Sequence, residues 1–435
     1  MNFPTISIDL TFFTNILNEL ARQSNPFAAG WLLLKLGGWV PLLILTYIGV
    51  KYLYMDYIVT RWYGKIKFVL LAIDIPKGNE QTPKAVENIF SHFYGMKSSI
   101  NWKQKYIHGK VQIVTSMEIV SRGGDIQFYI RTPLKYRDLV EAAIYSQYPD
   151  AEITEAEDYA KSFPKKFPSE KYEMFGCDFK MENDFIFPIR TYPQFEHGLS
   201  AEFKDPMSLI LEAMGRVRKD ETFAIQILLI PASDFWRKAA AQKVKKLLGK
   251  VPPSKPGIVG RTAGMLGEMA EYAVSGGIKT EGEKAKDNDM FKMLAMSPGE
   301  RKVIEGIEMK ISKVGFPCKL RFIQISPIEG FSTKYAMVKG FLKQFAVLGS
   351  NAFASIIKTM PRGDYWWQRM ARPRKQTTLT NAYANRDPVP GGPVYVLNIE
   401  ELATLWHFPV IEVKAPKVRR TEAKRAEPPR GLPIR

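Results

Sequence analysis

"GKVQIVTSMEIVSRGGDIQFYIRTP", residues 109 to 133, is the stretch that decides the fold class of this chain. Two runs rich in β-branched and aromatic residues flank the pair Gly123 and Gly124. Such a pattern is typical of two antiparallel strands joined by a tight turn. The stretch therefore predicts a β-hairpin, and its neighbours decide what kind of sheet the hairpin joins.

The segments on either side extend this hairpin into a module. A strand pattern and a helical pattern precede it, and a second helical pattern and a last strand pattern follow it, at 65–76, 82–96, 135–149 and 151–159. Thr82 and Pro83 mark the start of the first helix, because a threonine caps well and proline suits the first helical position. The order strand, helix, strand, strand, helix, strand predicts a ferredoxin-like (split βαβ) α+β module over 61–165.

A second run of patterns predicts a second ferredoxin-like α+β module over 166–380. Its strand patterns lie at 184–192, 222–232, 318–328 and 351–358. Its helical patterns lie at 205–217, 234–250, 297–314 and 331–349. From 250 to about 297 the chain is rich in Pro, Gly and Ala, which predicts a long mobile insertion. Residues 381–435 are predicted to form a strand-helix linker and a basic, Pro-rich tail.

The first 60 residues contain a long apolar run. From Leu36 to Val50 no residue is charged, and the flanking apolar residues extend the run to about twenty positions, enough to span a bilayer. The basic residues cluster after it, at Lys51, Arg61, Lys65 and Lys67, as the positive-inside rule requires for a cytoplasmic body. We predict an interfacial amphipathic helix, then one span of the inner (cytoplasmic) membrane over about 33–54. A buried core helix is the alternative.

Bulk composition limits the classes of partner. The chain has 435 residues, 46% of them hydrophobic and 24% charged, which is typical of two or three globular domains. Its net charge of +18 favours nucleic acid, anionic lipid or an acidic protein surface as a partner. Cys177 and Cys318 are the only cysteines, which excludes a disulfide framework or a CxxC metal site and fits a reducing compartment.

Motifs for catalysis are missing from the sequence. No G-x-x-x-x-G-K-[ST] phosphate-binding motif occurs, and the nearest string, "GIKTEGEK", has Glu283 where the lysine would be. No G-x-S-x-G nucleophile motif occurs, and the four histidines form no H-x-x-x-H pair. We therefore expect no catalytic residue, no cofactor and no metal site, and a protein that is not an enzyme.

Two basic stretches are candidates for binding a polyanion. Residues 235–267 carry eight basic and no acidic side chains, partly on a helix with an apolar opposite face. The candidate residues for DNA or anionic lipid are Arg237, Lys238, Lys243, Lys245, Lys246, Lys250 and Arg261. Residues 358–375 interleave six basic residues with Tyr365, Trp366 and Trp367, the mixture that single-strand binders use. A solvated helix face and an interdomain linker held by aromatics are the respective alternatives.

Three segments resemble a known family. "DIQFYIRTPLKYRDLVEAAIYSQYPDAEITEAEDY" (125–159), "VLNIEELATLWHFP" (396–409) and "RRTEAKRAEPPRGLP" (419–433) are similar to the membrane-anchored N-terminal region of bacterial type IV secretion or conjugation-like ATPases of the VirB4/HerA type. The resemblance covers about residues 30–433. In that family the last two segments lead into a RecA-type motor, and this sequence contains no such motor.

The resemblance implies a non-enzymatic, membrane-anchored subunit of a type IV secretion or conjugation-like machine. Its cytoplasmic body would dock a separately encoded RecA-type ATPase or that machine's substrate, and it could form a homo-oligomer. The apolar set Leu402, Leu405, Trp406 and Phe408 precedes a polar tail, so we predict that it docks the ATPase, with packing against the chain's own body as the alternative. Two other readings stay open: a membrane-tethered nucleic-acid-binding protein without a motor, and the front part of a split ATPase gene.

Overall fold

The computed structural model describes residues 27, 31, 39–76, 79–195, 205–232, 235–247 and 297–410. Almost all of the predicted insertion, the amphipathic helix predicted near the N-terminus and the tail after residue 410 lie outside the described residues. The chain divides into two compact units. The first comprises Met1–Ile66 with Ile100–Val111, and the second comprises Lys67–Ser99 with Gln112–Arg435.

The first unit is built on helix α3, Trp39–Tyr63. This 25-residue helix is long and apolar enough to cross a membrane, and only 6% of its most apolar window is buried. A short helix, α5 (Trp102–Tyr106), belongs to the same unit, and the Tyr54 hydroxyl donates a hydrogen bond to the Tyr106 carbonyl at 3.2 Å. Gly109 has φ +66° and lies so close to α3 that a Cβ atom would come within 2.3 Å of the Ile58 carbonyl oxygen. Only glycine fits there.

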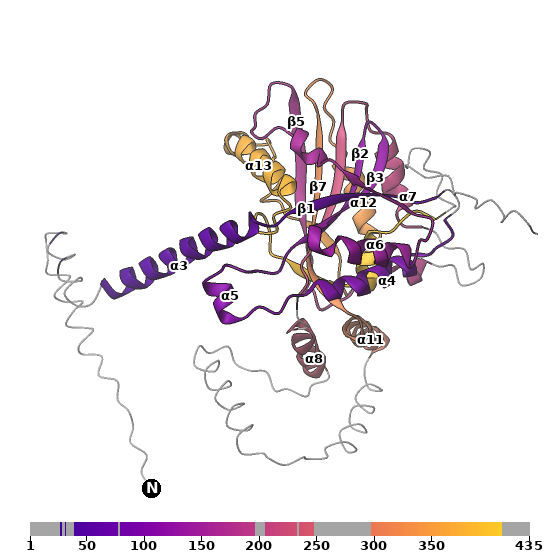
Figure 1. Cartoon of the computed structure of the whole chain (residues 1–435), viewed down its shortest axis with the longest axis horizontal. Helices are drawn as coiled ribbons and strands as arrows, with labels where there is room; N and C mark the ends of the chain where they lie inside the picture. The colour runs from indigo at the N-terminus through magenta and orange to yellow at the C-terminus, as the bar shows by residue number, and fades with distance from the viewer. Residues whose placement is uncertain are drawn as a thin grey trace, which may run out of the picture. The chain divides into compact units, whose positions relative to one another are not determined.

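The second unit contains one nine-stranded antiparallel sheet (Figure 1). Its main strand order is β4-β1-β3-β2-β6-β7-β5-β8, and β9 pairs with β7. The strands are β1 Phe68–Asp74, β2 Thr115–Arg122, β3 Asp125–Pro133, β4 Glu152–Ala156, β5 Tyr172–Met181, β6 Thr222–Leu229, β7 Gly315–Pro327, β8 Phe353–Ser355 and β9 Tyr395–Asn398. The Gly-Gly pair joins β2 to β3 with positive φ angles at both glycines, as the hairpin pattern predicts.

The sheet has two halves of equivalent connectivity. In the half β4-β1-β3-β2, β1 pairs with β3 and β4, and β2 pairs with β3. In the half β6-β7-β5-β8, β5 likewise pairs with β7 and β8, and β6 pairs with β7. The halves meet where β2 pairs with β6, Thr115 opposite Leu229. The predicted α+β class is confirmed, as one continuous antiparallel sheet.

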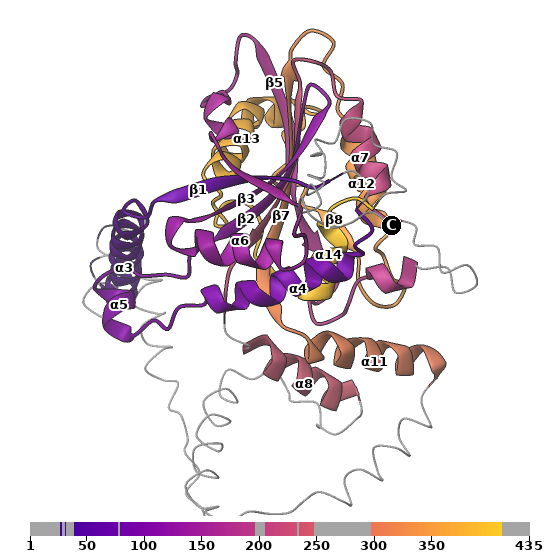
Figure 2. The ribbon, with the colours of Figure 1, turned by 45° about the vertical axis from the view of Figure 1, so that its right-hand side comes forward.

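Helices cover both faces of this sheet (Figure 1 and Figure 2). One face packs against α4 Pro83–Phe93, α6 Arg137–Tyr145, α7 Ser208–Gly215, α12 Tyr335–Lys343 and α14 Ile399–Leu405. The other face packs against α13 (Trp366–Ala384) and the 3-10 helix Tyr159–Ser162. Side chains alternate between the faces along each strand, so that Ile119 joins the first cluster and Val120 the second. Helices on both faces explain why the strands are apolar on both sides.

A separate small cluster joins the two helices on either side of the undescribed segment. α8 (Phe235–Leu247) buries Trp236, Ala240 and Val244 against Ile304 and Ile307 of α11, Pro298–Ser312. Ser297 caps α11: its Oγ accepts a hydrogen bond from the Glu300 amide, and the Glu300 carboxylate accepts from Ser297.

One predicted strand of the second half is wrong, and two of its elements were not predicted. Residues 184–192 form no strand, and the first strand of this half is β5, which the sequence analysis did not identify. Pro188 lacks an amide hydrogen and suits a turn rather than a ladder, whereas Gly176 and Asp178 mask the strand pattern of β5. The helix α13 was also missed, because Pro373 lies inside it and normally indicates a helix boundary.

Candidate binding surfaces

The start of α13 exposes a cluster of aromatic and apolar side chains. Tyr365, Trp366, Trp367 and Met370 expose 56, 69, 53 and 75% of their surface. With Arg369 and Arg374 they form what we call the α13 surface. Exposed apolar groups gathered in one place mark interaction sites more often than isolated ones do. Rings this exposed favour a binding surface over the alternative of an interdomain linker held by aromatics, which stays untested.

The rings of the α13 surface are ordered against one another. Tyr365 stacks on Trp367, with ring centroids 4.7 Å apart and ring planes within 2° of parallel. Trp366 meets Trp367 edge to face at 5.8 Å and 85°. Each stacked ring uses one face in this pair. The high exposure of all three residues leaves further ring surface open to a ligand.

The stretch that carries these rings also carries basic side chains, which have different partners. Arg372 forms a salt bridge with Glu173 at 3.1 Å, which offsets its charge. The Arg369 side chain donates from Nε to the Gly363 carbonyl at 3.1 Å, its one side-chain hydrogen bond among the described residues. Arg374 and Lys358 are exposed. The stretch 358–375 has six basic residues and one acidic residue, so its local charge is strongly positive.

The other half of α13 is fixed to the sheet. Gln376 donates from Nε2 to the Met174 carbonyl at 2.9 Å, and the Phe167 amide donates to the Thr377 hydroxyl at 2.9 Å. Leu379 packs against Gly176, where a Cβ atom would come within 3.1 Å of its Cδ2. The exposed start of the helix is therefore held by a buried end.

A buried ionic network holds the residue that follows α13. Arg386, with φ 54°, donates to the Glu118 carboxylate from Nε at 2.9 Å and to Asp158 from Nη1 at 2.6 Å. Burial raises the pKa of Glu118, but the Arg386 guanidinium and the hydrogen bonds from Tyr159 and Ser116 together hold that pKa below its ordinary value. Gln226 and Tyr159 also donate to Glu118. The Glu118 and Arg386 side chains are buried against each other, while the Asp158 side chain is 23% exposed, so the network holds the residue that follows α13 in place.

The family comparison covers most of the sheet. A model described as a domain of unknown function, DUF8128, matches residues 75–346. The chain belongs to the DUF8128 family. No curated protein matches it. The DUF8128 match runs from the end of β1 to the end of α12, so α3, α13 and α14 all lie outside it.

The DUF8128 region contains the predicted polyanion-binding helix α8. Lys238 and Lys245 are exposed on it. Arg237 instead donates to the Lys313 carbonyl at 3.0 Å, and the Lys243 ammonium lies 5.8 Å from the centre of the Phe187 ring. Lys246 is in α8, but its side chain is not described, and Lys250 and Arg261 lie outside the described residues. The described part of this face thus offers two exposed lysines, and polyanion binding by it stays a prediction.

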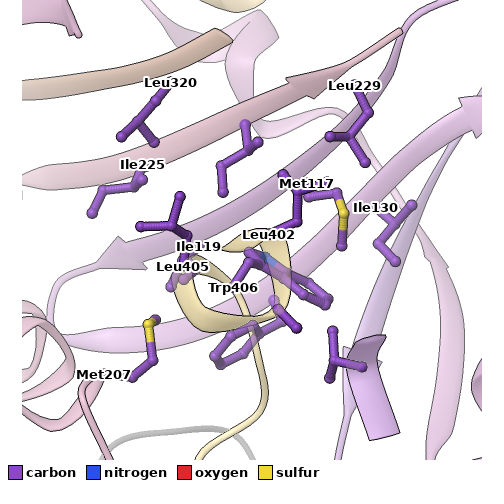
Figure 3. Packing of buried hydrophobic residues seen from close by; sticks show 14 of the residues in the cluster. Met117, Ile119, Ile130, Met207, Ile225, Leu229, Leu320, Leu402, Leu405 and Trp406 are labelled. Carbon is purple, nitrogen blue, oxygen red and sulfur yellow. The ribbon is translucent and has the colours of Figure 1, made fainter. Parts of the chain in front are cut away.

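The four residues predicted to dock a partner, which follow the DUF8128 region, are buried. Leu402, Leu405, Trp406 and Phe408 are at most 2% exposed. Figure 3 shows Leu402, Leu405 and Trp406 close to Met117 and Ile119 of β2, among the side chains of the sheet. The hypothesis that these four residues dock a partner is therefore corrected: the chain's own body covers them.

Three features explain this burial, two of them contacts between residues distant in sequence. β9 adds to the edge of β7, Cys318 opposite Tyr395, and so places α14 over the sheet next to α4. Asn398 caps α14, accepting from the Glu401 amide at 2.8 Å. The Glu401 carboxylate pairs with the fully buried Lys310 ammonium of α11 at 2.9 Å. The sequence around the polar tail could not predict that these residues are buried, because the surface that covers them is distant in sequence.

The loop before β9 is also held in place. Lys319 donates from Nζ to the Pro388 carbonyl at 2.7 Å, and Arg321 donates from Nε to the Asp178 carboxylate at 2.7 Å. Gly391, with φ +99°, passes so near that a Cβ atom would overlap the Asp178 carboxylate at 1.8 Å. Burial lowers the pKa of Lys319 to about 8. These groups act in packing. Among the residues the structure describes, no group of three or more His, Cys, Asp or Glu could hold a metal ion.

Proposed function

We propose that this chain is a non-enzymatic, membrane-anchored binding subunit of a type IV secretion or conjugation-like machine. Helix α3 anchors it in the cytoplasmic membrane, and the body docks a separately encoded RecA-type ATPase or the transported substrate. The observation that carries the proposal is the exposure of α3, whose apolar side chains find almost no cover in the protein.

The membrane part of the proposal follows from the character of α3. A helix that is apolar on all sides is either buried in a protein core or in a bilayer. α3 is not in a core, since only Ile58 of its residues is buried. At 25 residues and 1.5 Å per residue it is about 37 Å long, more than the roughly 30 Å of a bilayer's apolar core. Arg61 and the lysines after it favour a cytoplasmic body.

The docking part rests on the resemblance and on the body. We interpret each half of the sheet as one ferredoxin-like module, because its connectivity is that of a split βαβ unit. The residues of α14 are buried, so an ATPase would contact another surface than the one the sequence indicates. A body with many buried ion pairs suits a scaffold that keeps its shape on binding.

Co-purification tests the proposal. The full chain is co-expressed with a RecA-type ATPase encoded in a neighbouring reading frame, and membranes are extracted with detergent. We expect the ATPase to co-purify with the chain from the membrane fraction. Removal of residues 1–63 should release the body to the soluble fraction. A full chain that is soluble, or an ATPase that never co-purifies, contradicts the proposal.

A further inference from the structure

We propose that the α13 surface binds single-stranded nucleic acid. The inference rests on the proposed function and deepens it, because it names the class of substrate that the body handles. The ligand would be a strand whose unpaired bases stack on the rings of Tyr365, Trp366 and Trp367 and whose phosphates meet Arg369 and Arg374.

The stacked pair provides the platform for bases. The Tyr365 and Trp367 rings lie within 2° of parallel, so a base placed on the open side of the pair continues an existing stack. Trp366, 69% exposed, offers a second ring at a steep angle to the first. Every base has a π-face, so this contact is tolerant of sequence. Weak sequence preference follows.

The arginines provide the phosphate contacts. Arg369 is oriented through its Nε hydrogen bond to Gly363, and its terminal amino groups donate no hydrogen bond to the described residues. Arg374 is exposed on the same helix, and Lys358 is exposed just before it. A guanidinium donates two parallel hydrogen bonds to a phosphate, which suits a strand backbone. Arg372 takes no part, because Glu173 pairs with it.

The surface is ordered before a ligand arrives. The buried half of α13 is fixed by Gln376, Thr377 and Leu379, so the helix that displays the rings does not have to form on binding. Aromatic side chains also lose little conformational freedom on contact. The entropic cost of binding is lowered in both ways.

The ordered rings favour a single strand over two other polyanions. In a duplex the bases are already stacked on one another, and exposed rings cannot reach their faces. An anionic bilayer attracts Trp, Tyr and Arg to its interface, but this attraction does not require two rings to be held parallel. The parallel pair is therefore the feature that points to bases.

Fluorescence anisotropy of the full chain in detergent micelles tests the inference. The probe is a fluorescein-labelled oligothymidine of about 20 nucleotides, titrated at several salt concentrations. We expect Trp366→Ala and Trp367→Ala each to weaken binding about 5-fold or more, as loss of one stacked base predicts. Arg374→Gln should lower the slope of log affinity against log salt by about 0.7.

Matched controls separate the surface from general effects. Tyr145→Ala removes an exposed tyrosine on α6, and Arg216→Gln removes an exposed arginine directly after α7. Both should bind the oligonucleotide like the unaltered chain. Unchanged circular dichroism spectra and unfolding midpoints for all variants establish that the fold is kept.

Three results overturn the inference. They are no saturable binding by the unaltered chain, equal binding by the tryptophan variants, and a tryptophan-dependent affinity for phosphatidylglycerol vesicles without affinity for the oligonucleotide. The last result assigns the surface to a membrane. Retention of the chain in membranes is measured separately, so failure of strand binding with normal retention rejects this inference and not the proposed function.

Discussion

Replacing Trp406 by alanine tests whether the C-terminal segment belongs to the core of the body. Trp406 is 1% exposed, and its ring meets those of Phe90, Phe128 and Phe408 at centroid distances of 6.4, 5.6 and 5.0 Å. The indole Nε1 is buried without a hydrogen-bond partner. The side chain therefore contributes through packing alone.

The magnitude follows from these contacts. Replacing a buried tryptophan by alanine costs about 3–5 kcal/mol, and each aromatic pair is worth roughly 0.5–1.5 kcal/mol beyond its buried area. With three such pairs and no hydrogen bond to lose, we expect Trp406→Ala to lower the free energy of unfolding by about 4 kcal/mol. Trp406→Phe keeps a ring and removes the unpartnered donor, so its cost should be less than half as large.

Urea unfolding of the full chain in detergent micelles, followed by near-ultraviolet circular dichroism, measures this difference. Trp367→Ala on the α13 surface is the matched control and should change stability by no more than about 0.5 kcal/mol. Termination after residue 414 keeps every described contact and should be neutral, whereas termination before Val394 removes β9 and α14 and should prevent stable folding. A loss below about 1 kcal/mol for Trp406→Ala would refute the assignment of α14 to the core.

Three further predictions concern charge and nucleotide. Burial raises the pKa values of Glu118 and Asp205, but contacts with Arg386 and His407 respectively help to hold both pKa values below their ordinary values. The two carboxylates therefore stabilise the fold fully above about pH 4.5, and this stabilisation is lost as the pH falls through their folded-state pKa values. Urea midpoints measured from pH 6 downward should therefore fall steeply only in the acid limb, and a flat profile contradicts this. Replacing Lys238 and Lys245 by glutamine should weaken binding to heparin and reduce its salt dependence without moving the urea midpoint. An unchanged salt dependence would show that this face of α8 is a solvated face that binds no polyanion. Isothermal titration with Mg·ATP should give no saturable binding, because the sequence lacks a phosphate-binding lysine, and a micromolar affinity abolished by one substitution would contradict that expectation.

The first half of the sheet could be predicted from the sequence because its signals are local. The Gly123-Gly124 turn, Pro83 at the start of α4 and the β-branched and aromatic runs of β2 and β3 each depend on a few neighbouring residues. The structure has a strand or helix at each of these places. A hairpin or a cap is decided by adjacent residues, so such signals survive folding unchanged.

The parts that could not be predicted depend on distant contacts. Helix α13 contains Pro373, and its stability comes from packing on β5 and from the buried network at Arg386 rather than from its own sequence. The burial of Trp406 depends on β9 pairing with β7, about 80 residues earlier in the chain. The aromatic and basic composition of 358–375 was visible in the sequence, but the exposure that makes it a candidate surface was not.

Alkaline carbonate extraction of cell membranes tests the central claim, that α3 anchors this body in a bilayer. The unaltered chain should stay in the membrane pellet. A chain with Ile44→Arg and Leu45→Arg should be extracted, because each arginine near the middle of a span costs about 2.5–3.5 kcal/mol on insertion. The variant's body should still unfold at the same urea concentration, since neither residue packs in it. Recovery of the unaltered chain in the carbonate-soluble fraction would contradict the account.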